Sequence, residues 1–114
     1  MSLLRAWVSA GESGPVIMLA GETDITTAAQ LSELVTGQLA GGTQQLMIDA
    51  SGLSFADSAS IRVLVLAART VRRRGGELVL LRPQQALARM LEIMGVDQVI
   101  TIRGATEVIP GPDR

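Results

Sequence analysis

Three residue types that carry much of protein chemistry are missing from this 114-residue sequence, which contains no cysteine, no histidine and no lysine. Without cysteine, no disulfide bond and no thiolate metal site can form. Without histidine, the usual general base and the commonest metal ligand are absent as well. Aromatic residues are scarce, since Trp7 and Phe55 are the only two. We therefore expect neither a histidine-based enzyme nor a bound cofactor.

The charges are nearly balanced, with ten arginines against eleven acidic residues and a formal net charge of −1 at pH 7. This balance gives no reason to expect nucleic acid as a partner. Hydrophobic residues make up 47% of the sequence, but no apolar run approaches the ~20 residues that a membrane-spanning helix needs. Residues 1–5 lack the charged start and the long apolar core of a signal peptide. We expect a soluble, cytoplasmic protein that does not bind membranes.

Three helices are predicted from apolar residues that recur at spacings of three and four. The first runs from Thr26 or Thr27 to about residue 39, and the second covers about residues 58–74. A third helix follows Pro83, and the residues expected on its buried face are Leu87, Met90, Leu91 and Met94. Residues 106–109 have the length of only one further helical turn.

Short apolar runs between turn-forming residues predict strands. The first two form a hairpin within residues 3–20, and the second of these strands covers residues 16–20. Three further strands are expected over residues 46–50, 77–81 and 99–102. The run over 46–50 is expected to end in a turn at Ser51-Gly52, and Trp7 to cover sheet surface. Alternating strands and helices indicate an α/β fold, a single domain over residues 1–114 with a mixed β-sheet, helices packed on it and a flexible C-terminal tail.

The most informative segment is residues 55–62, because it joins a predicted buried strand to a long amphipathic helix. Asp57 or Ser58 is the natural N-cap of that helix, with a side-chain oxygen for the first free backbone amides. A cap alone explains these two residues at a value of roughly 1 kcal/mol. A nucleophilic serine would need a base that the chain lacks, whereas a serine that accepts phosphate needs only exposure.

Two stretches of the sequence resemble the STAS domain, and in particular the bacterial anti-sigma factor antagonists. The first is IDASGLSFADS over residues 48–58, and the second is GETDITTA over residues 21–28. The resemblance implies a STAS-like fold along nearly the whole chain. It also implies that Ser58, directly after Asp57, is phosphorylated by a partner serine kinase.

The same resemblance suggests a surface for the partner. Glu22, Asp24 and Asp57 are expected at one edge of the sheet, although capping explains Asp24 equally well. On the helix that starts at Ser58, a second face is formed by Ala59, Val63, Leu66 and Thr70, with Arg62, Arg69 and Arg73 along one flank. The alternative for the arginine run at 72–74 is that it suits the negative end of the helix dipole.

The sequence departs from the family at two positions, where Ser60 and Arg62 replace glycines. Ser60 adds a second hydroxyl and removes a point of close approach. Arg62 adds bulk and positive charge within reach of Asp57 or of a phosphate on Ser58. We expect the acceptor to remain while the partner surface, including Ser60 and Arg62, differs from that of typical family members.

The leading hypothesis is an anti-sigma factor antagonist that is not an enzyme. In the unphosphorylated form it would bind an anti-sigma factor that is also a serine kinase, and so free a sigma factor. Phosphorylation on Ser58 would release the partner, and a phosphatase would reset the protein. The alternatives are a non-switching STAS scaffold or a sensor subunit of a larger signalling complex. The sequence leaves the oligomeric state open.

Overall fold

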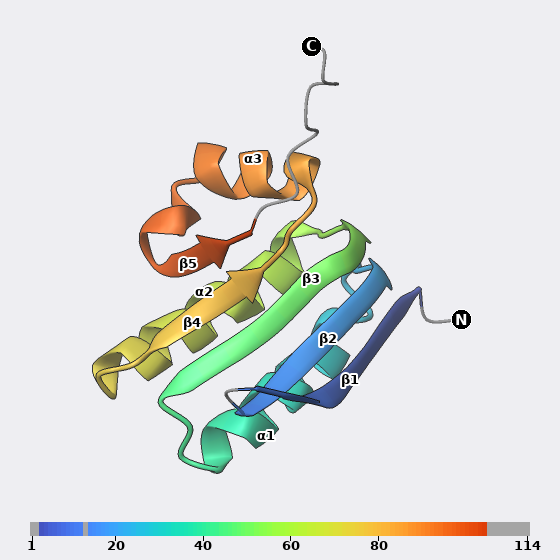
Figure 1. Cartoon of the computed structure of the whole chain (residues 1–114). Coiled ribbons are helices and arrows are strands. Elements are labelled where there is room, and N and C mark those ends of the chain that lie inside the picture. The colour runs from blue at the N-terminus through green and yellow to red at the C-terminus, as the bar shows by residue number, and fades with distance from the viewer. Residues whose placement is uncertain (1–2, 13, 105–114) are drawn as a thin grey trace.

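The computed structural model describes residues 3–12 and 14–104, in which strands and helices alternate (Figure 1). The predicted α/β class is confirmed, with an N-terminal hairpin, a mixed sheet and three α-helices. In chain order the elements are β1 (Leu4–Gly11), β2 (Gly14–Glu22), α1 (Ala28–Ala40), β3 (Gln45–Phe55), α2 (Ser58–Arg73), β4 (Glu77–Leu81), α3 (Gln85–Ile93), the short 3-10 helix η1 (Val96–Gln98) and β5 (Ile100–Arg103).

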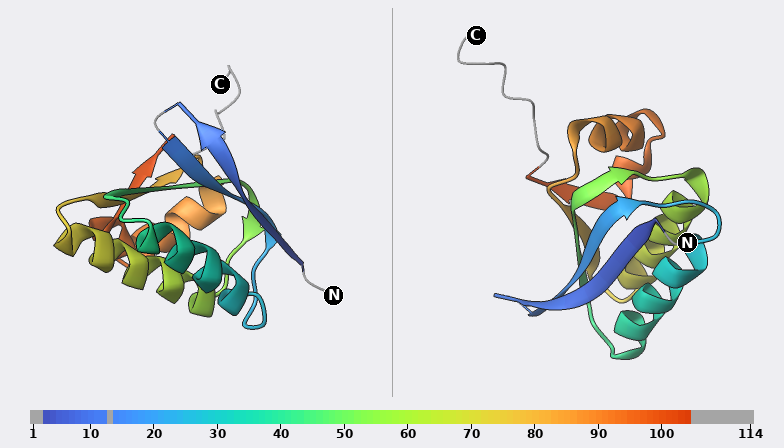
Figure 2. Two further views of the ribbon diagram at one scale, coloured as in Figure 1. Left: turned by 90° about the horizontal axis from the view of Figure 1, so that it is seen from below. Right: turned by 90° about the vertical axis from the view of Figure 1, so that its right-hand side faces the viewer.

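The five strands form one sheet in the order β1-β2-β3-β4-β5. Only β1 and β2 are antiparallel, and the other neighbours are parallel because a helix connects each pair. Helices α1 and α2 lie side by side against one face of the sheet, and α3 lies toward its end (Figures 1 and 2). The carboxyl ends of β2 and β3 therefore lie next to each other, which is where the two family-like stretches occur.

The core lies between the sheet and the helices. Alternate residues of the strands point into it, and α1, α2 and α3 contribute residues at helical spacing. Fully buried members of this cluster include Ile17, Ile48, Leu80, Leu91 and Ile100. The long apolar face of α2 supplies the largest helical share, with Ile61, Leu64, Ala67, Ala68 and Val71 all buried.

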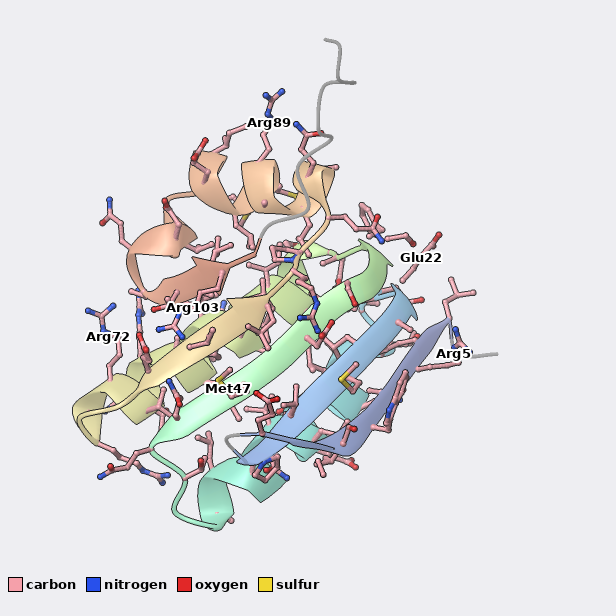
Figure 3. The ribbon with its side chains drawn as sticks, in the orientation of Figure 1. Arg5, Glu22, Met47, Arg72, Arg89 and Arg103 are labelled. Carbon is pink, nitrogen blue, oxygen red and sulfur yellow. The ribbon has the colours of Figure 1, made fainter. Side chains whose placement is uncertain are left out.

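The opposite face of the sheet is covered by no helix in the described part of the chain. Figure 3 shows Met47 on this face, in front of the ribbon. Trp7, Met18, Asp49, Leu81 and Arg103 form one row across it, because they are partners in successive strand pairs. Trp7 on β1 is 46% exposed, so this end of the row is open.

The expected turn at Ser51-Gly52 is wrong, because β3 continues through these residues to Phe55. The turn-like composition instead marks an irregularity in the pairing with β2, where the partners shift between Met18 and Ala20. The carboxylate of Asp49 accepts hydrogen bonds from the Ser51 amide at 2.9 Å and from its hydroxyl at 2.7 Å. Local side-chain bonds of this kind compete with the regular backbone hydrogen bonds between β2 and β3, but they do not end the strand.

Met94 was also misplaced, since it is 47% exposed instead of buried. Helix α3 ends at Ile93, so Met94 no longer follows the helical spacing that buries Leu87 and Leu91. The short helix η1 was not predicted, and the last strand lies one residue later than expected. The predicted turn over residues 106–109 and the tail lie outside the described residues. No helix in the described ranges is long and apolar enough to cross a membrane.

Candidate functional site

Helix α2 begins at Ser58, and Asp57 is its N-cap. Asp57 has an extended backbone, and its carboxylate accepts a hydrogen bond from the Ser60 amide at 3.3 Å. The Asp57 carbonyl accepts the bond from the Ile61 amide, which closes the first helical turn. Of the two predicted caps, the structure therefore selects Asp57 and leaves the Ser58 side chain outside this role.

Thr23 joins the two family-like stretches. Its hydroxyl donates to the Asp57 carboxylate at 2.7 Å and accepts a bond from the Asp57 amide at 2.9 Å. The Thr23 amide donates to the Phe55 carbonyl at 3.0 Å, and the residue is only 2% exposed. Thr23 is not among the predicted site residues, because nothing in the sequence distinguishes a buried threonine from an exposed one at this turn.

Asp24 shapes the turn that leads from β2 into α1. One oxygen of its carboxylate accepts bonds from the Thr26 amide and hydroxyl and from the Thr27 amide, at 2.9, 2.6 and 2.9 Å. These bonds hold the pKa of Asp24 below its ordinary value. Asp24 thus closes the turn before α1, whose N-cap is Thr27, and its carboxylate is held in the charged form at the edge of the sheet.

Three carboxylates lie near this edge. Glu22, labelled in Figure 3, is the partner of Phe55 across the β2 and β3 pair, and Thr23, which lies between Glu22 and Asp24, bonds to Asp57. Burial opposes the charge of Asp57, but bonds from the Ser60 amide and the Thr23 hydroxyl outweigh it and hold the pKa of Asp57 below its ordinary value. Glu22, Asp24 and Asp57 thus give the surroundings of Ser58 a negative character at neutral pH.

The two serines in the first turn of α2 differ in access. Ser58 is exposed, whereas Ser60 is only 1% exposed. The Ser60 side-chain oxygen is buried and has no hydrogen-bond partner within the described residues. Ser60 was expected to contact a partner, but its side chain is closed off from the surface. Only Ser58 can be reached by a kinase in this turn.

We expect Ser60→Ala to raise the free energy of unfolding by about 1 kcal/mol, because a buried hydroxyl without a partner costs free energy. The melting temperature should rise by about 4 °C. Ser58→Ala is the matched control, since it makes the same chemical change in the same turn at an exposed position. A melting temperature that is lowered by Ser60→Ala would show that the hydroxyl has a stabilising partner.

The second face of α2 was predicted to lie opposite the core. In the structure it faces α1. A groove of about 200 Å³ runs between the two helices, and Val63, Leu66 and Thr70 line it from the side of α2. Val63 is half-buried and packs against the core, whereas Leu66 is 51% exposed. Ala59 is half-buried as well. Of this predicted set, Leu66 offers the largest free apolar surface.

The arginines of α2 divide into two groups. Arg72 donates to the Gln98 carbonyl at 2.7 Å, and Arg74, just after the helix, donates to the Leu39 carbonyl at 2.8 Å. These two side chains connect the end of α2 to η1 and to α1, which is a structural role. Arg62 is exposed and forms no ion pair with Asp57 or with any other residue in the described ranges. Its guanidinium is therefore open to solvent near the start of α2.

A second polar cluster lies on the uncovered face of the sheet. The Asp49 side chain is 2% exposed and forms an ion pair with Arg82, which has a left-handed backbone with φ of 52°. Burial works against the charge of Asp49, but bonds from Ser51 and the nearby guanidinium keep its pKa below the ordinary value. The sequence contained one signal for this site, which was an acidic residue inside an apolar strand.

A model of the STAS family described as "Mlab, STAS domain" matches residues 7–103, so this chain belongs to that family of STAS domains. Its relatives are named anti-sigma factor antagonists. The chain is 25% identical over 92 residues to the anti-sigma-B factor antagonist of Staphylococcus aureus, covering 81% of this chain and 85% of the relative. It is 29% identical over 106 residues to the anti-sigma-F factor antagonist RsfA of Mycobacterium tuberculosis, covering 91% and 83%.

Solved structures share the fold. An anti-sigma factor antagonist from Mycobacterium paratuberculosis superposes with a TM-score of 0.77 at 22% identity, covering 88% of this chain and 85% of the other. The anti-sigma factor antagonist SpoIIAA in its unphosphorylated form gives a TM-score of 0.72 at 22% identity, covering 90% of each chain. Within the described residues, no cluster of acidic side chains is arranged to hold a metal ion.

Proposed function

We propose that this chain acts by partner switching, as an anti-sigma factor antagonist whose Ser58 is phosphorylated by the partner itself. The observation that carries the proposal is an exposed Ser58 hydroxyl at the first position of α2, beside an Asp57 that Thr23 holds in place. The function needs no catalytic group in this chain, because the kinase supplies the base and the nucleotide. The partner would be an anti-sigma factor with serine kinase activity.

Phosphate on Ser58 would add about 1.5 to 2 negative charges at pH 7. The start of α2 tolerates this charge, since the helix dipole favours anions there. The carboxylates of Glu22, Asp24 and Asp57 repel it, and a partner docked over this edge would have to cover like charges and remove their water. The phosphorylated protein should therefore release its partner while it remains folded.

A relative supports the idea that this fold accepts the modification. SpoIIAA is known in a phosphorylated form as well as in the unphosphorylated one, and the phosphorylated structure superposes on this chain with a TM-score of 0.68 at 21% identity. The residues near Ser58 that would meet the partner are the exposed Glu22 and Arg62 and the half-buried Asp57, with the exposed Leu66 further along α2. Ala59 and Val63 would contribute only their free edges.

A non-switching subunit of a larger complex is the second candidate. It is favoured by Ser60 and Arg62 in the first turns of α2, since the resemblance to the antagonists implies glycine at these two positions. In that case Ser58 would remain unmodified, and the same surface would hold a permanent partner. The decisive difference is the response to a negative charge at Ser58.

The test is affinity capture from the native lysate with wild type, Ser58→Ala and Ser58→Asp as baits. Gln44→Glu serves as the control, because it adds one negative charge at the opposite end of β3. We expect a serine kinase of the anti-sigma type to bind wild type, Ser58→Ala and the control, and to be depleted at least tenfold with Ser58→Asp. With ATP, that kinase should place phosphate on Ser58 and none on Ser60, as read by mass spectrometry. Equal capture by all four baits would favour the non-switching subunit.

A further inference from the structure

Strand β1 turns the backbone groups of Ala6, Val8 and Ala10 away from β2. The Glu22 amide donates to the Leu3 carbonyl, so odd-numbered residues of this antiparallel pair bond to β2. The even-numbered residues point their N–H and C=O groups away from β2. Ala6, Val8 and Ala10 make no hydrogen bond to the described residues through these groups. They form a ladder open to another strand.

Apart from the charge of Arg5, this edge lacks the features that normally prevent strands from pairing. Natural edge strands are shortened, or carry lysine, proline or a bulge. Strand β1 has eight residues, pairs with β2 without a register shift, and contains neither lysine nor proline. By contrast, β5 at the other edge has only four residues. Figure 2 shows that the β1 and β2 hairpin extends away from the helices, so the edge is accessible there.

Apolar side chains stand on both sides of this edge. Trp7 is 46% exposed on the uncovered face, and Val8 is 43% exposed on the helical side. A strand that paired with β1 would cover both of them. An aromatic residue opposite another aromatic residue is among the favourable cross-strand pairs in antiparallel sheets.

We infer that the partner of this edge is a second copy of the chain, with two β1 strands antiparallel about a twofold axis through Trp7. The two Trp7 side chains then form a cross-strand pair on the uncovered face. Ala6 of each copy pairs with Val8 of the other through the free N–H and C=O groups. The result is one continuous sheet of ten strands, and this antiparallel contact is self-complementary, as a twofold interface requires.

The charges of β1 favour this antiparallel arrangement. Arg5 lies near the start of the strand (Figure 3), and Glu12 directly follows its end. Both are exposed, and neither forms an ion pair within the described residues. Glu12 borders a cavity of about 340 Å³ with Val16 and Met47, which places it toward the uncovered face where Arg5 lies. In this register Arg5 of each copy lies opposite Ser9 of the other, so Glu12 of the other copy is about 10 Å further along the strand and the opposite charges attract across the interface without direct contact.

Sedimentation equilibrium from low micromolar to several hundred micromolar concentration tests the inference. We expect a reversible monomer–dimer equilibrium and a blue shift of tryptophan fluorescence as the dimer forms, since Trp7 is the only tryptophan. Amide exchange at Ala6 and Val8 should slow as concentration rises. Val8→Pro removes an N–H that points away from β2, so it should abolish the dimer without breaking the bonds between β1 and β2.

Charge reversal provides a second test that does not depend on the proline variant. Arg5→Glu should weaken dimerisation about threefold, because two attractive charge pairs become repulsive, and Arg5→Glu with Glu12→Arg should restore it. A monomer at all concentrations would overturn the inference. A dimer that still forms with Val8→Pro, and whose wild-type Ala6 and Val8 amides exchange as fast as in the monomer, would also overturn it. The same holds for a dimer whose dissociation constant is changed by neither charge variant.

Discussion

Gly76→Ala is expected to lower the free energy of unfolding by about 3 kcal/mol, the largest loss we predict for a single added methyl group. Gly76 precedes β4, where the Glu77 amide donates to the Gln44 carbonyl at 3.1 Å and starts the pairing of β3 with β4. A Cβ atom at residue 76 would overlap that same carbonyl group. Since backbone must move to make room, the melting temperature should fall by roughly 10–15 °C in a thermal unfolding experiment.

Two other glycines serve as controls for this prediction. Gly75 has a left-handed φ of 85°, but nothing lies within 4 Å of an added Cβ, so Gly75→Ala should cost only about 1 kcal/mol. Gly37 lies inside α1 and is also unobstructed, so Gly37→Ala should stabilise the protein by about 0.5–1 kcal/mol. If Gly76→Ala lowered the free energy of unfolding by less than Gly75→Ala does, the close approach to Gln44 would not be the reason that residue 76 must be glycine.

Arg82→Ala is expected to destabilise the protein by about 2–3 kcal/mol, because it leaves the buried Asp49 carboxylate without its cation. The two bonds from Ser51 remain and keep the loss below that of an unpaired charge. Denaturant unfolding measures the change directly. Adding Asp49→Asn to Arg82→Ala should recover part of the loss, since a neutral amide does not require a cation. If the double variant is as unstable as the sum of the single ones, the pair is not coupled.

The pH dependence gives an independent measure of the same pair. The folded pKa of Asp49 lies below the ordinary value of 3.8, so its stabilisation is present above that pH and is lost as the pH falls through the folded pKa. In Arg82→Ala the guanidinium is gone while burial still opposes the charge, so the pKa of Asp49 should rise. Acid unfolding of this variant should therefore begin at a higher pH than in wild type.

The two polar clusters have different consequences for function. The bonds among Thr23, Asp57 and Ser60 fix the backbone on which Ser58 stands, whereas the ion pair of Asp49 with Arg82 lies on the uncovered face of the sheet. In our proposal, a phosphate on Ser58 changes the charge of a surface whose backbone is held by these hydrogen bonds. Release of the partner then follows from electrostatics and desolvation, and needs no change of fold.

Most of the secondary structure could be predicted because it depends on local patterns. The strand over 77–81 matched the prediction, and the helix from Ser58 ended within one residue of the expected position, because each is bounded by turn residues or a cap. The prediction failed at Ser51-Gly52, where pairing with β2 carries the strand past turn-like residues. The predicted burial of Met94 was wrong because the spacing of apolar residues does not show at which residue a helix ends, and α3 ends at Ile93.

The sequence by itself determined the family, the order of the elements and the position of Ser58 at the start of a helix, because these follow from the spacing of apolar residues and from short strings near Asp57. Only the tertiary structure decided that Ser58 is exposed while Ser60 is buried, that Thr23 holds Asp57, and that Asp49 pairs with Arg82. Each of these contacts joins elements that are distant in the chain or depends on burial, and burial is set by the packing of the sheet against its helices.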